Sequence, residues 1–133
     1  MLIPLTLLLT FTTATPPTDT SLLQAICAVE SNCDGSKVGD GGRAIGPYQI
    51  WNVYWQDAVE FDESIGGTYE DCVEKEYSER IIRAYWQRYA TQKRLGRKPT
   101  DEDKARIHNG GPNGYKKKST EKYWNKIKEK LNG

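Results

Sequence analysis

Apolar residues recur every three or four positions in several stretches of the chain, which is the spacing of one helix face. The first stretch begins at Ser21 and fades at residues 31–32, so that Glu30 falls on its last turn. The same pattern predicts helices over residues 51–61, 76–95, 100–108 and about 120–131. The longest of these carries one apolar stripe, formed by Ile81, Ile82, Tyr85, Trp86 and Tyr89.

Short polar motifs mark where several of these helices begin and end. A Ser or Thr that precedes a Gln or Asp by three residues predicts a capping box. This spacing occurs at Ser21–Gln24, at Thr68–Asp71 before a helix in the 70s, and at Thr100–Asp103. Gly96 is expected to end the long helix, because glycine adopts the left-handed backbone that closes a helix.

Glycine gathers in the segment after the first helix, where residues 34–46 contain five. Such density predicts tight, hairpin-like turns, and Tyr48 to Ile50 follow as a short strand candidate. Residues 109–114 form a second loop rich in Gly, Pro and Asn. We therefore expect an α+β domain, mostly helical, with a small Gly-rich β-hairpin or sheet beside a cleft.

The first 14 residues contain no charged side chain and include a short apolar run. The run is too short to span a bilayer and fits the hydrophobic region of a signal peptide, with cleavage after Ala14. Residues 15–20 then read as a linker and 21–133 as one domain. We expect a secreted protein, extracellular or periplasmic, without stable membrane insertion after cleavage.

Charge is divided unevenly along the chain, although the net charge is only +1. Residues 1–74 hold 2 basic and 11 acidic side chains, and residues 75–133 hold 17 basic and 7 acidic. A basic half favours an anionic partner such as a bacterial wall, a membrane surface or a nucleic acid. Alternatively, the two halves neutralise each other across the fold.

Three cysteines are present, which is an odd number. Cys27 and Cys33 are six residues apart and can close a small loop, which leaves Cys72 without a partner. The chain has no CxxC pair, and its single histidine, His108, is far from the cysteines in sequence. The sequence therefore predicts no zinc site, and we expect no metal or other cofactor.

Glu30 is a candidate general acid for hydrolysis of a glycosidic bond. Such an acid must stay protonated near neutral pH, and its pKa is raised by a helix C-terminus and by apolar neighbours such as Ile26 and Val29. A glutamate at a helix end is more often simply solvated. The position alone therefore does not distinguish a catalytic from a surface role.

Several short sequence blocks say more about the function of the chain than the position of Glu30 does. They are ICAVESNC at 26–33, GPYQI at 46–50, YWQD at 54–57, ARIHNGGPNG at 105–114 and YW at 123–124. In order and spacing these blocks resemble the invertebrate-type (i-type) lysozymes, the destabilase family, from about residue 22 to residue 130. The chain looks like a cysteine-poor, divergent or bacterial member of that family.

The resemblance implies a role for each matching residue. Glu30 matches the family's general acid, and Cys27 and Cys33 match a disulfide that brackets it. Asp40 is the best match for the second carboxylate, as nucleophile or charge stabiliser, with Asp34 in reserve. The expected substrate-binding residues are Tyr48, Gln49, Ile50, Trp51, His108, Asn109 and Gly110.

The resemblance also implies a reaction: cleavage of the β-1,4 bond between N-acetylmuramic acid and N-acetylglucosamine in the bacterial cell wall. Peptidoglycan is then the expected partner, with no nucleic acid, and we expect a monomer.

Three alternatives stay open. A lytic transglycosylase would use Glu30 alone, and a destabilase-like isopeptidase would need a nucleophile such as Ser31 or Ser36. The third alternative is a wall-binding antimicrobial protein without catalysis.

Overall fold

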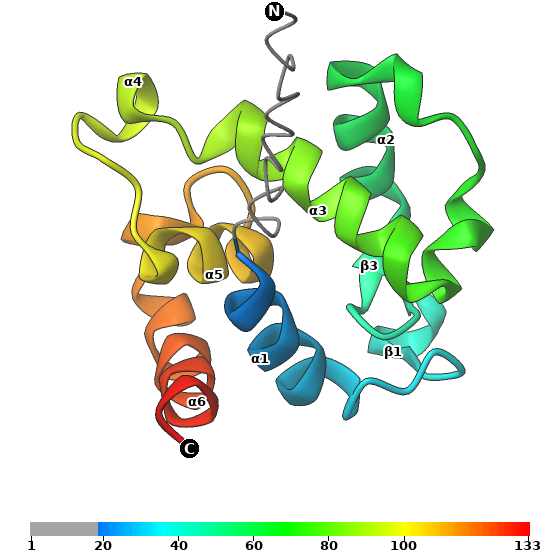
Figure 1. The fold of residues 1–133 in the computed structure, drawn as a ribbon, viewed down its shortest axis with the longest axis horizontal. Helices are drawn as coiled ribbons and strands as arrows, with labels where there is room; N and C mark the ends of the chain where they lie inside the picture. Colours follow the sequence, from blue (N-terminus) through cyan, green and yellow to red (C-terminus); the bar gives the residue numbers. More distant parts are fainter. Residues whose placement is uncertain (1–18) are drawn as a thin grey trace, which may run out of the picture.

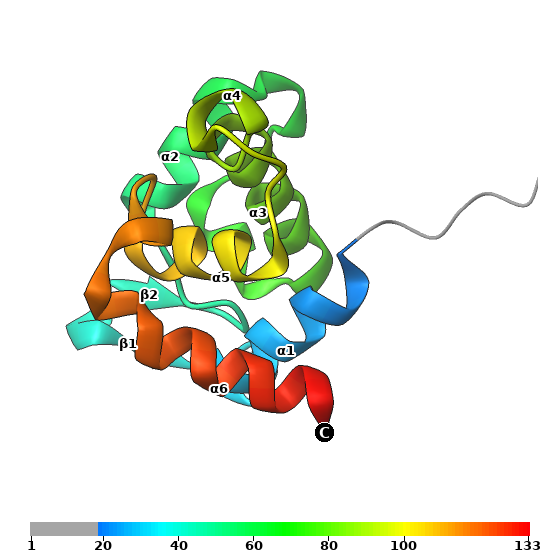
Figure 2. The ribbon, with the colours of Figure 1, turned by 90° about the vertical axis from the view of Figure 1, so that its left-hand side faces the viewer.

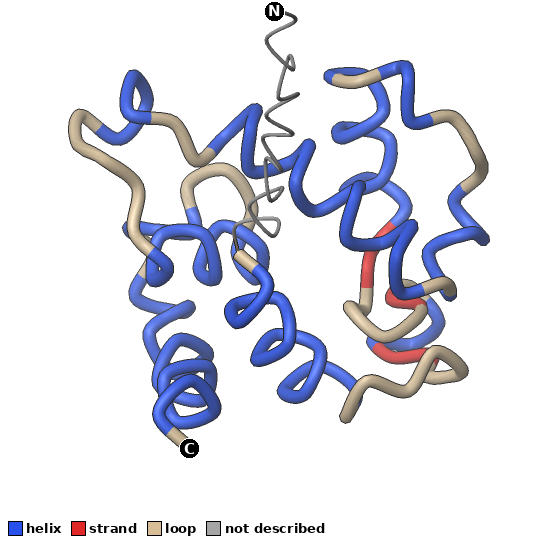
Figure 3. The backbone as a smooth tube through the Cα atoms, viewed as in Figure 1, coloured by secondary structure: helices blue, strands red, loops and turns tan. Residues whose placement is uncertain are grey.

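A computed structural model describes residues 19–133, and the expected signal peptide and most of the linker lie outside this range. The described part is mainly helical, with three short strands at one side (Figures 1 and 3). The helices are α1 (Thr20–Ser31), α2 (Asn52–Phe61), α3 (Lys75–Tyr89), α4 (Gln92–Leu95), α5 (Asp101–Gly110) and α6 (Glu121–Asn132). The strands are β1 (Val38–Gly39), β2 (Ala44–Ile45) and β3 (Ile50–Trp51). The α+β architecture expected from the sequence is confirmed.

The helices pack in pairs around one core. α1 lies along α6, α2 lies along α3, and α5 runs between α3 and α6 (Figures 1 and 2). The apolar faces predicted from the sequence turn inward. The buried side chains include Leu22, Leu23 and Ile26 of α1, Ile81, Ile82, Tyr85 and Trp86 of α3, Ile107 of α5 and Ile127 of α6. None of the helices within residues 19–133 has the length and apolar character to cross a membrane.

The Gly-rich segment forms an antiparallel sheet in the order β1-β2-β3, as the turn residues predicted. Val38 pairs with Ile45, and Ile45 in turn pairs with Ile50. Gly46, in the turn between β2 and β3, has a φ of 80° and lies so close to the Cys72 carbonyl that a Cβ would be 2.0 Å from that oxygen. Only glycine therefore fits where this sheet meets the residues before α3.

Two helix boundaries differ from the prediction. α1 begins at Thr20 after Asp19, so Ser21 lies inside the helix and does not cap it. The reason is that Asp19 already accepts the first helical bond, from the Leu23 amide, while its carboxylate binds Lys104. The capping box at Thr100 is confirmed, but α5 continues past His108 to Gly110.

The predicted helix over 76–95 is two helices, with α3 ending at Tyr89 and α4 beginning at Gln92. Thr91 is extended and its hydroxyl accepts a hydrogen bond from the Arg94 amide, so it caps a new helix and does not continue the old one. The Arg94 guanidinium meanwhile binds the Tyr89 carbonyl at the end of α3. Gly96 ends α4 in the left-handed conformation that was predicted.

Two shorter elements also differ. Thr68 and Asp71 do form a capping box, but it opens a five-residue 3₁₀ helix, Tyr69–Val73, and α3 starts only at Lys75. The expected strand at Tyr48–Ile50 begins at Ile50. Gln49 has a φ of 52°, and its side-chain amide donates to the carbonyls of Lys37 and Gly46. These bonds stabilise a turn at the place where the pattern suggested a strand.

Candidate active site

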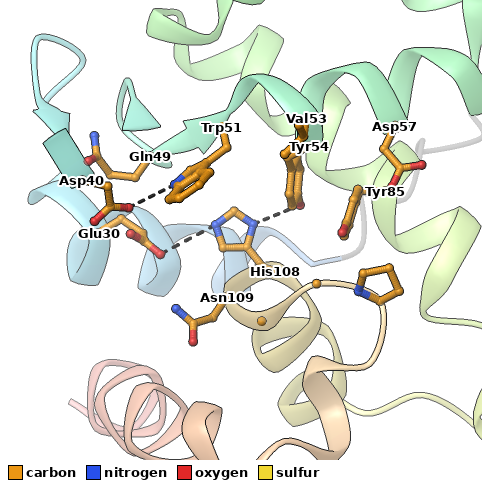
Figure 4. A pocket seen from close by; sticks show the side chains of 13 residues that line it. Glu30, Asp40, Gln49, Trp51, Val53, Tyr54, Asp57, Tyr85, His108 and Asn109 are labelled. Carbon is orange, nitrogen blue, oxygen red and sulfur yellow. Dashed lines mark hydrogen bonds and ion pairs between the residues drawn. The ribbon is translucent and has the colours of Figure 1, made fainter. Parts of the chain in front are cut away.

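A cleft of about 520 Å³ lies between the β sheet and the helices α2, α3 and α5 (Figure 4). It is lined by both carboxylates predicted from the sequence, Glu30 and Asp40. The other predicted residues at its walls are Gln49, Trp51, His108, Asn109 and Gly110. The structure therefore brings together residues from the end of α1, the Gly-rich segment, β3 with the residue before it, and the end of α5.

The backbone around Glu30 is held by a sharp reversal at the end of α1. Asn32 and Cys33 both adopt left-handed conformations, and the Asn32 amide donates back into the last turn. The predicted disulfide between Cys27 and Cys33 is present and spans this reversal. On the other side, Lys37 donates from its Nζ to the Glu30 carbonyl. Glu30 thus projects from a backbone that is fixed on both sides.

The Glu30 carboxyl is largely removed from water, with 19% of its side chain exposed. Burial is the main cause that raises its pKa from 4.5 to about 7. The Asp40 charge raises it further, while the Lys37 charge lowers it. The Tyr123 hydroxyl of α6, which is buried and lacks a partner of ordinary hydrogen-bond geometry, lies close enough to lower this pKa as well. A carboxyl with a pKa near 7 can both donate and accept a proton at neutral pH.

Asp40, unlike Glu30, lies on an exposed turn. It begins a three-residue 3₁₀ turn, Asp40–Gly42, with a φ of 50°, and its side chain is exposed at the cleft. Its Oδ2 accepts a hydrogen bond of 3.0 Å from the Trp51 indole nitrogen. The Arg43 guanidinium lies over the same Trp51 ring, 5.1 Å from its centre, and donates to the Asp40 carbonyl. Asp40 is therefore held by the turn and by an aromatic ring of the cleft wall.

His108 occupies the middle of the cleft wall, and its side chain is 3% exposed (Figure 4). Its Nε2 lies 3.2 Å from the Tyr48 carbonyl oxygen and 3.8 Å from Oε1 of Glu30. Its Nδ1 lies 3.0 Å from the Tyr54 hydroxyl. Burial lowers the pKa of His108 from 6.5 to about 4, so the imidazole is neutral at pH 7.

Some predicted residues do not reach the cleft. Tyr48 and Ile50 are absent from its lining, because their side chains are buried in the core and the Tyr48 hydroxyl binds Glu79. Asp34, the reserve carboxylate, is exposed outside the cleft and accepts hydrogen bonds from Ser36.

The serines considered as isopeptidase nucleophiles are also engaged elsewhere, since the Ser36 hydroxyl donates to Asp34. The Ser31 hydroxyl is buried and donates to the Pro47 carbonyl. Neither serine therefore has the histidine or lysine partner that a nucleophile requires.

Several cleft residues were not predicted from the sequence: Val53, Tyr54, Asp57, Tyr85, Gly111 and Pro112. Tyr54 stacks on Tyr85 with ring centres 3.8 Å apart and planes 13° apart. Asp57 binds Arg88 and the Tyr89 hydroxyl. Tyr54 and Asp57 belong to the YWQD block at 54–57, which is the sequence signal that could have found them. In residues 19–133 no His, Cys, Asp and Glu side chains form a group of three or more that could hold a metal ion.

Comparison with known proteins identifies the family of the chain. A family model described as Destabilase matches residues 19–130. The chain belongs to the destabilase family. Invertebrate-type lysozyme 6 from Caenorhabditis elegans is 34% identical over 113 residues, which cover 80% of this chain and 82% of that protein. Lysozyme 1 from Crassostrea virginica is 37% identical over 108 residues, 79% of this chain but only 55% of the longer relative.

A solved structure, Meretrix lusoria lysozyme in complex with Aeromonas hydrophila PliI, superimposes with a TM-score of 0.71 at 34% identity. The match covers 83% of this chain and 88% of that one. The family resemblance inferred from the sequence is thereby confirmed, as is the enzyme class: this member of the destabilase family is a lysozyme-type glycoside hydrolase.

Proposed function

We propose that this destabilase-family protein hydrolyses the β-1,4 bond between N-acetylmuramic acid and N-acetylglucosamine in peptidoglycan. The observation that carries the proposal is the pairing of two carboxyl groups in one cleft, with Glu30 buried at a helix end and Asp40 exposed on a turn. Glycoside hydrolysis uses two carboxyl groups in different protonation states, one acid and one base or nucleophile. The family assignment supplies the substrate class.

In this proposal Glu30 donates its proton to the glycosidic oxygen as the bond to the sugar breaks. Asp40 stabilises the positive charge that develops on the sugar ring, or forms a bond to it as nucleophile. Glu30 then removes a proton from the incoming water, which restores its protonated form. Trp51 and Gln49, which line the cleft beside Asp40, would contact the sugar rings.

The protein is proposed to act outside the producing cell, or in the periplasm, as a monomer after removal of residues 1–14. The start of the mature chain at Thr15 can be read by N-terminal sequencing of protein recovered from the growth medium.

The test compares the wild type with Glu30→Gln for clearing of a Gram-positive wall suspension. Removing a general acid is expected to lower the rate about 10²- to 10⁴-fold. Asp34→Asn is the matched carboxylate control outside the cleft, and it should clear walls at the wild-type rate. Retention of clearing by Glu30→Gln would refute Glu30 as the general acid, whereas loss of clearing with undiminished killing of live bacteria would indicate an antimicrobial action by binding alone. Mass spectrometry should show reducing ends, whereas anhydro-sugar ends would identify a transglycosylase.

A further inference from the structure

A chain of polar contacts connects the cleft wall to Glu30 through the histidine. The Tyr54 hydroxyl contacts Nδ1 of His108, and Nε2 of the same ring faces both the Tyr48 carbonyl and Oε1 of Glu30. All three contacts are drawn from different elements: α2, the turn before β3 and the end of α1. None of them is visible as a motif, since Tyr54 and His108 are 54 residues apart.

The partners of the ring determine where its hydrogen lies. A neutral imidazole carries one donor and one acceptor nitrogen. The Tyr48 carbonyl can only accept, so the 3.2 Å contact favours the tautomer with the hydrogen on Nε2. Nδ1 is then the acceptor, and the Tyr54 hydroxyl donates to it at 3.0 Å. The opposite tautomer would place two lone pairs face to face at the Tyr48 carbonyl.

Tyr54 is well placed to enforce this choice. Its ring is stacked on Tyr85 of α3, which fixes the direction of the hydroxyl. Burial raises the pKa of its hydroxyl well above the usual value, so this group keeps its proton near neutral pH and can donate to Nδ1. A donor at Nδ1 and an acceptor at Nε2 stabilise the same tautomer.

The tautomer matters because of what it presents to Glu30. With the hydrogen on Nε2, a neutral donor stands 3.8 Å from Oε1, too far for a full hydrogen bond but close enough for its dipole to favour the carboxylate. The other groups that act on Glu30 are Lys37 and Asp40 from the Gly-rich segment and Tyr123 from α6. Among these groups, His108 is the one whose tautomer decides whether it stabilises or destabilises the Glu30 carboxylate.

We propose that Tyr54 is a positioning residue that holds neutral His108 with its hydrogen on Nε2, so that a donor faces Glu30 as that residue loses its proton to the leaving group. The inference rests on the proposed role of Glu30 as general acid. It adds Tyr54 and His108 as a pair that stabilises the carboxylate formed midway through the reaction.

The first test needs no variant, because His108 is the only histidine of the chain. Protein labelled with ¹⁵N and expressed without a histidine tag should give one imidazole in a long-range ¹H–¹⁵N spectrum. At pH 6 to 7 that spectrum should show the neutral tautomer with hydrogen on Nε2. A hydrogen on Nδ1, or a cationic ring at pH 6, would overturn the proposal.

The second test removes the Tyr54 hydroxyl with Tyr54→Phe, which keeps the stacked ring. We expect a mixture of tautomers, and a Glu30 pKa, followed by the ¹³C shift of its carboxyl, that rises by about half a pH unit with the loss of one neutral donor interaction. The alkaline limb of the pH–activity profile should shift to higher pH by the same amount. Tyr85→Phe, which removes the hydroxyl of the other ring in the stack, is the control and should leave the tautomer unchanged.

Substitutions of His108 itself distinguish its role as a hydrogen-bond donor toward Glu30 from its role in packing. His108→Gln can place an amide N–H near the position of Nε2, so it should retain about fivefold more activity than His108→Leu, the equivalent of one neutral hydrogen bond. Equal activity of the two variants, or an unchanged Glu30 pKa in Tyr54→Phe, would refute the pair's role. The imidazole spectrum can be recorded whether or not the protein clears walls. An inactive wild type would therefore refute only the proposed function.

Discussion

Glu30 and Asp40 line the same cleft, but they come from opposite kinds of structure. Glu30 projects from the last turn of a 12-residue helix that is packed on α6 and closed by a disulfide. Asp40 begins a three-residue turn whose other two residues are glycines with positive φ, and its side chain is open to solvent. One carboxyl is thus placed by the core of the domain, and the other by a local turn with a single aromatic partner.

This difference shows how one small domain can give two carboxyl groups different tasks. Removing a carboxyl from water penalises its charged form, which is why the pKa of Glu30 rises to about 7. An exposed carboxylate on a turn is hydrated and hydrogen-bonded in its charged form. The environment of Glu30, the proposed acid, therefore depends on long-range packing, and that of Asp40, the proposed charge stabiliser, depends on the conformation of a few residues.

After Glu30→Gln, the largest loss of activity is expected from a change at the exposed carboxylate. Asp40→Asn keeps an oxygen that can accept from Trp51 but removes the negative charge, so we expect wall clearing to fall about 10²- to 10³-fold, the usual cost of losing an electrostatic stabiliser. Asp62→Asn is a matched control, since Asp62 also accepts hydrogen bonds at an exposed 3₁₀ turn. Near wild-type clearing by Asp40→Asn, with anhydro-sugar products, would leave Glu30 as the sole catalytic carboxyl.

The next effect concerns the buried site and is measured as stability against pH. Glu30 has a raised pKa, so its contribution is lost as pH rises from 4.5 to about 7. His108 has a lowered pKa, so its contribution is lost as pH falls from 6.5 to about 4. Between pH 4.5 and 6.5 the two slopes oppose each other, and together they should change the free energy of unfolding little.

Glu30→Gln removes the opposing contribution of Glu30, so the pH dependence of stability that comes from His108 should become visible. In this variant we expect the free energy of unfolding to rise by about 3 kcal/mol between pH 4 and pH 6.5, from the full His108 shift. Urea unfolding at half-unit intervals of pH measures this directly for both proteins. If the variant shows no more slope than the wild type over that window, His108 is not neutral in the folded protein.

The smallest effect refines the placement of Asp40. Trp51→Phe keeps an aromatic ring in the cleft wall but removes the N–H that binds Oδ2, so we expect kcat/KM to fall about tenfold. Trp55→Phe removes an indole N–H that binds Tyr77 away from the cleft, and it should affect activity much less. A loss in Trp51→Phe confined to KM would indicate that Trp51 binds sugar and does not hold Asp40.

Features that depend on neighbours along the chain could be predicted from the amino-acid sequence. Helical spacing of apolar residues placed Glu30 on the last turn of α1 and the core stripe on α3, and two of three capping boxes formed as predicted. The short separation of Cys27 and Cys33 allowed the disulfide that forms. These features are local because they involve residues within a few turns of one helix or loop.

The set of residues around the Glu30 carboxyl, by contrast, depends on how the helices pack in three dimensions. Tyr54, His108 and Tyr123 come from three different helices, and they meet Glu30 only because α2, α5 and α6 pack around the end of α1. The same packing turned Tyr48 and Ile50 into core residues and left Asp34 outside the cleft. Burial and its effect on pKa arise from groups far apart in sequence, so a pattern along the chain could point to Glu30 as a candidate acid but could not show the environment that raises its pKa.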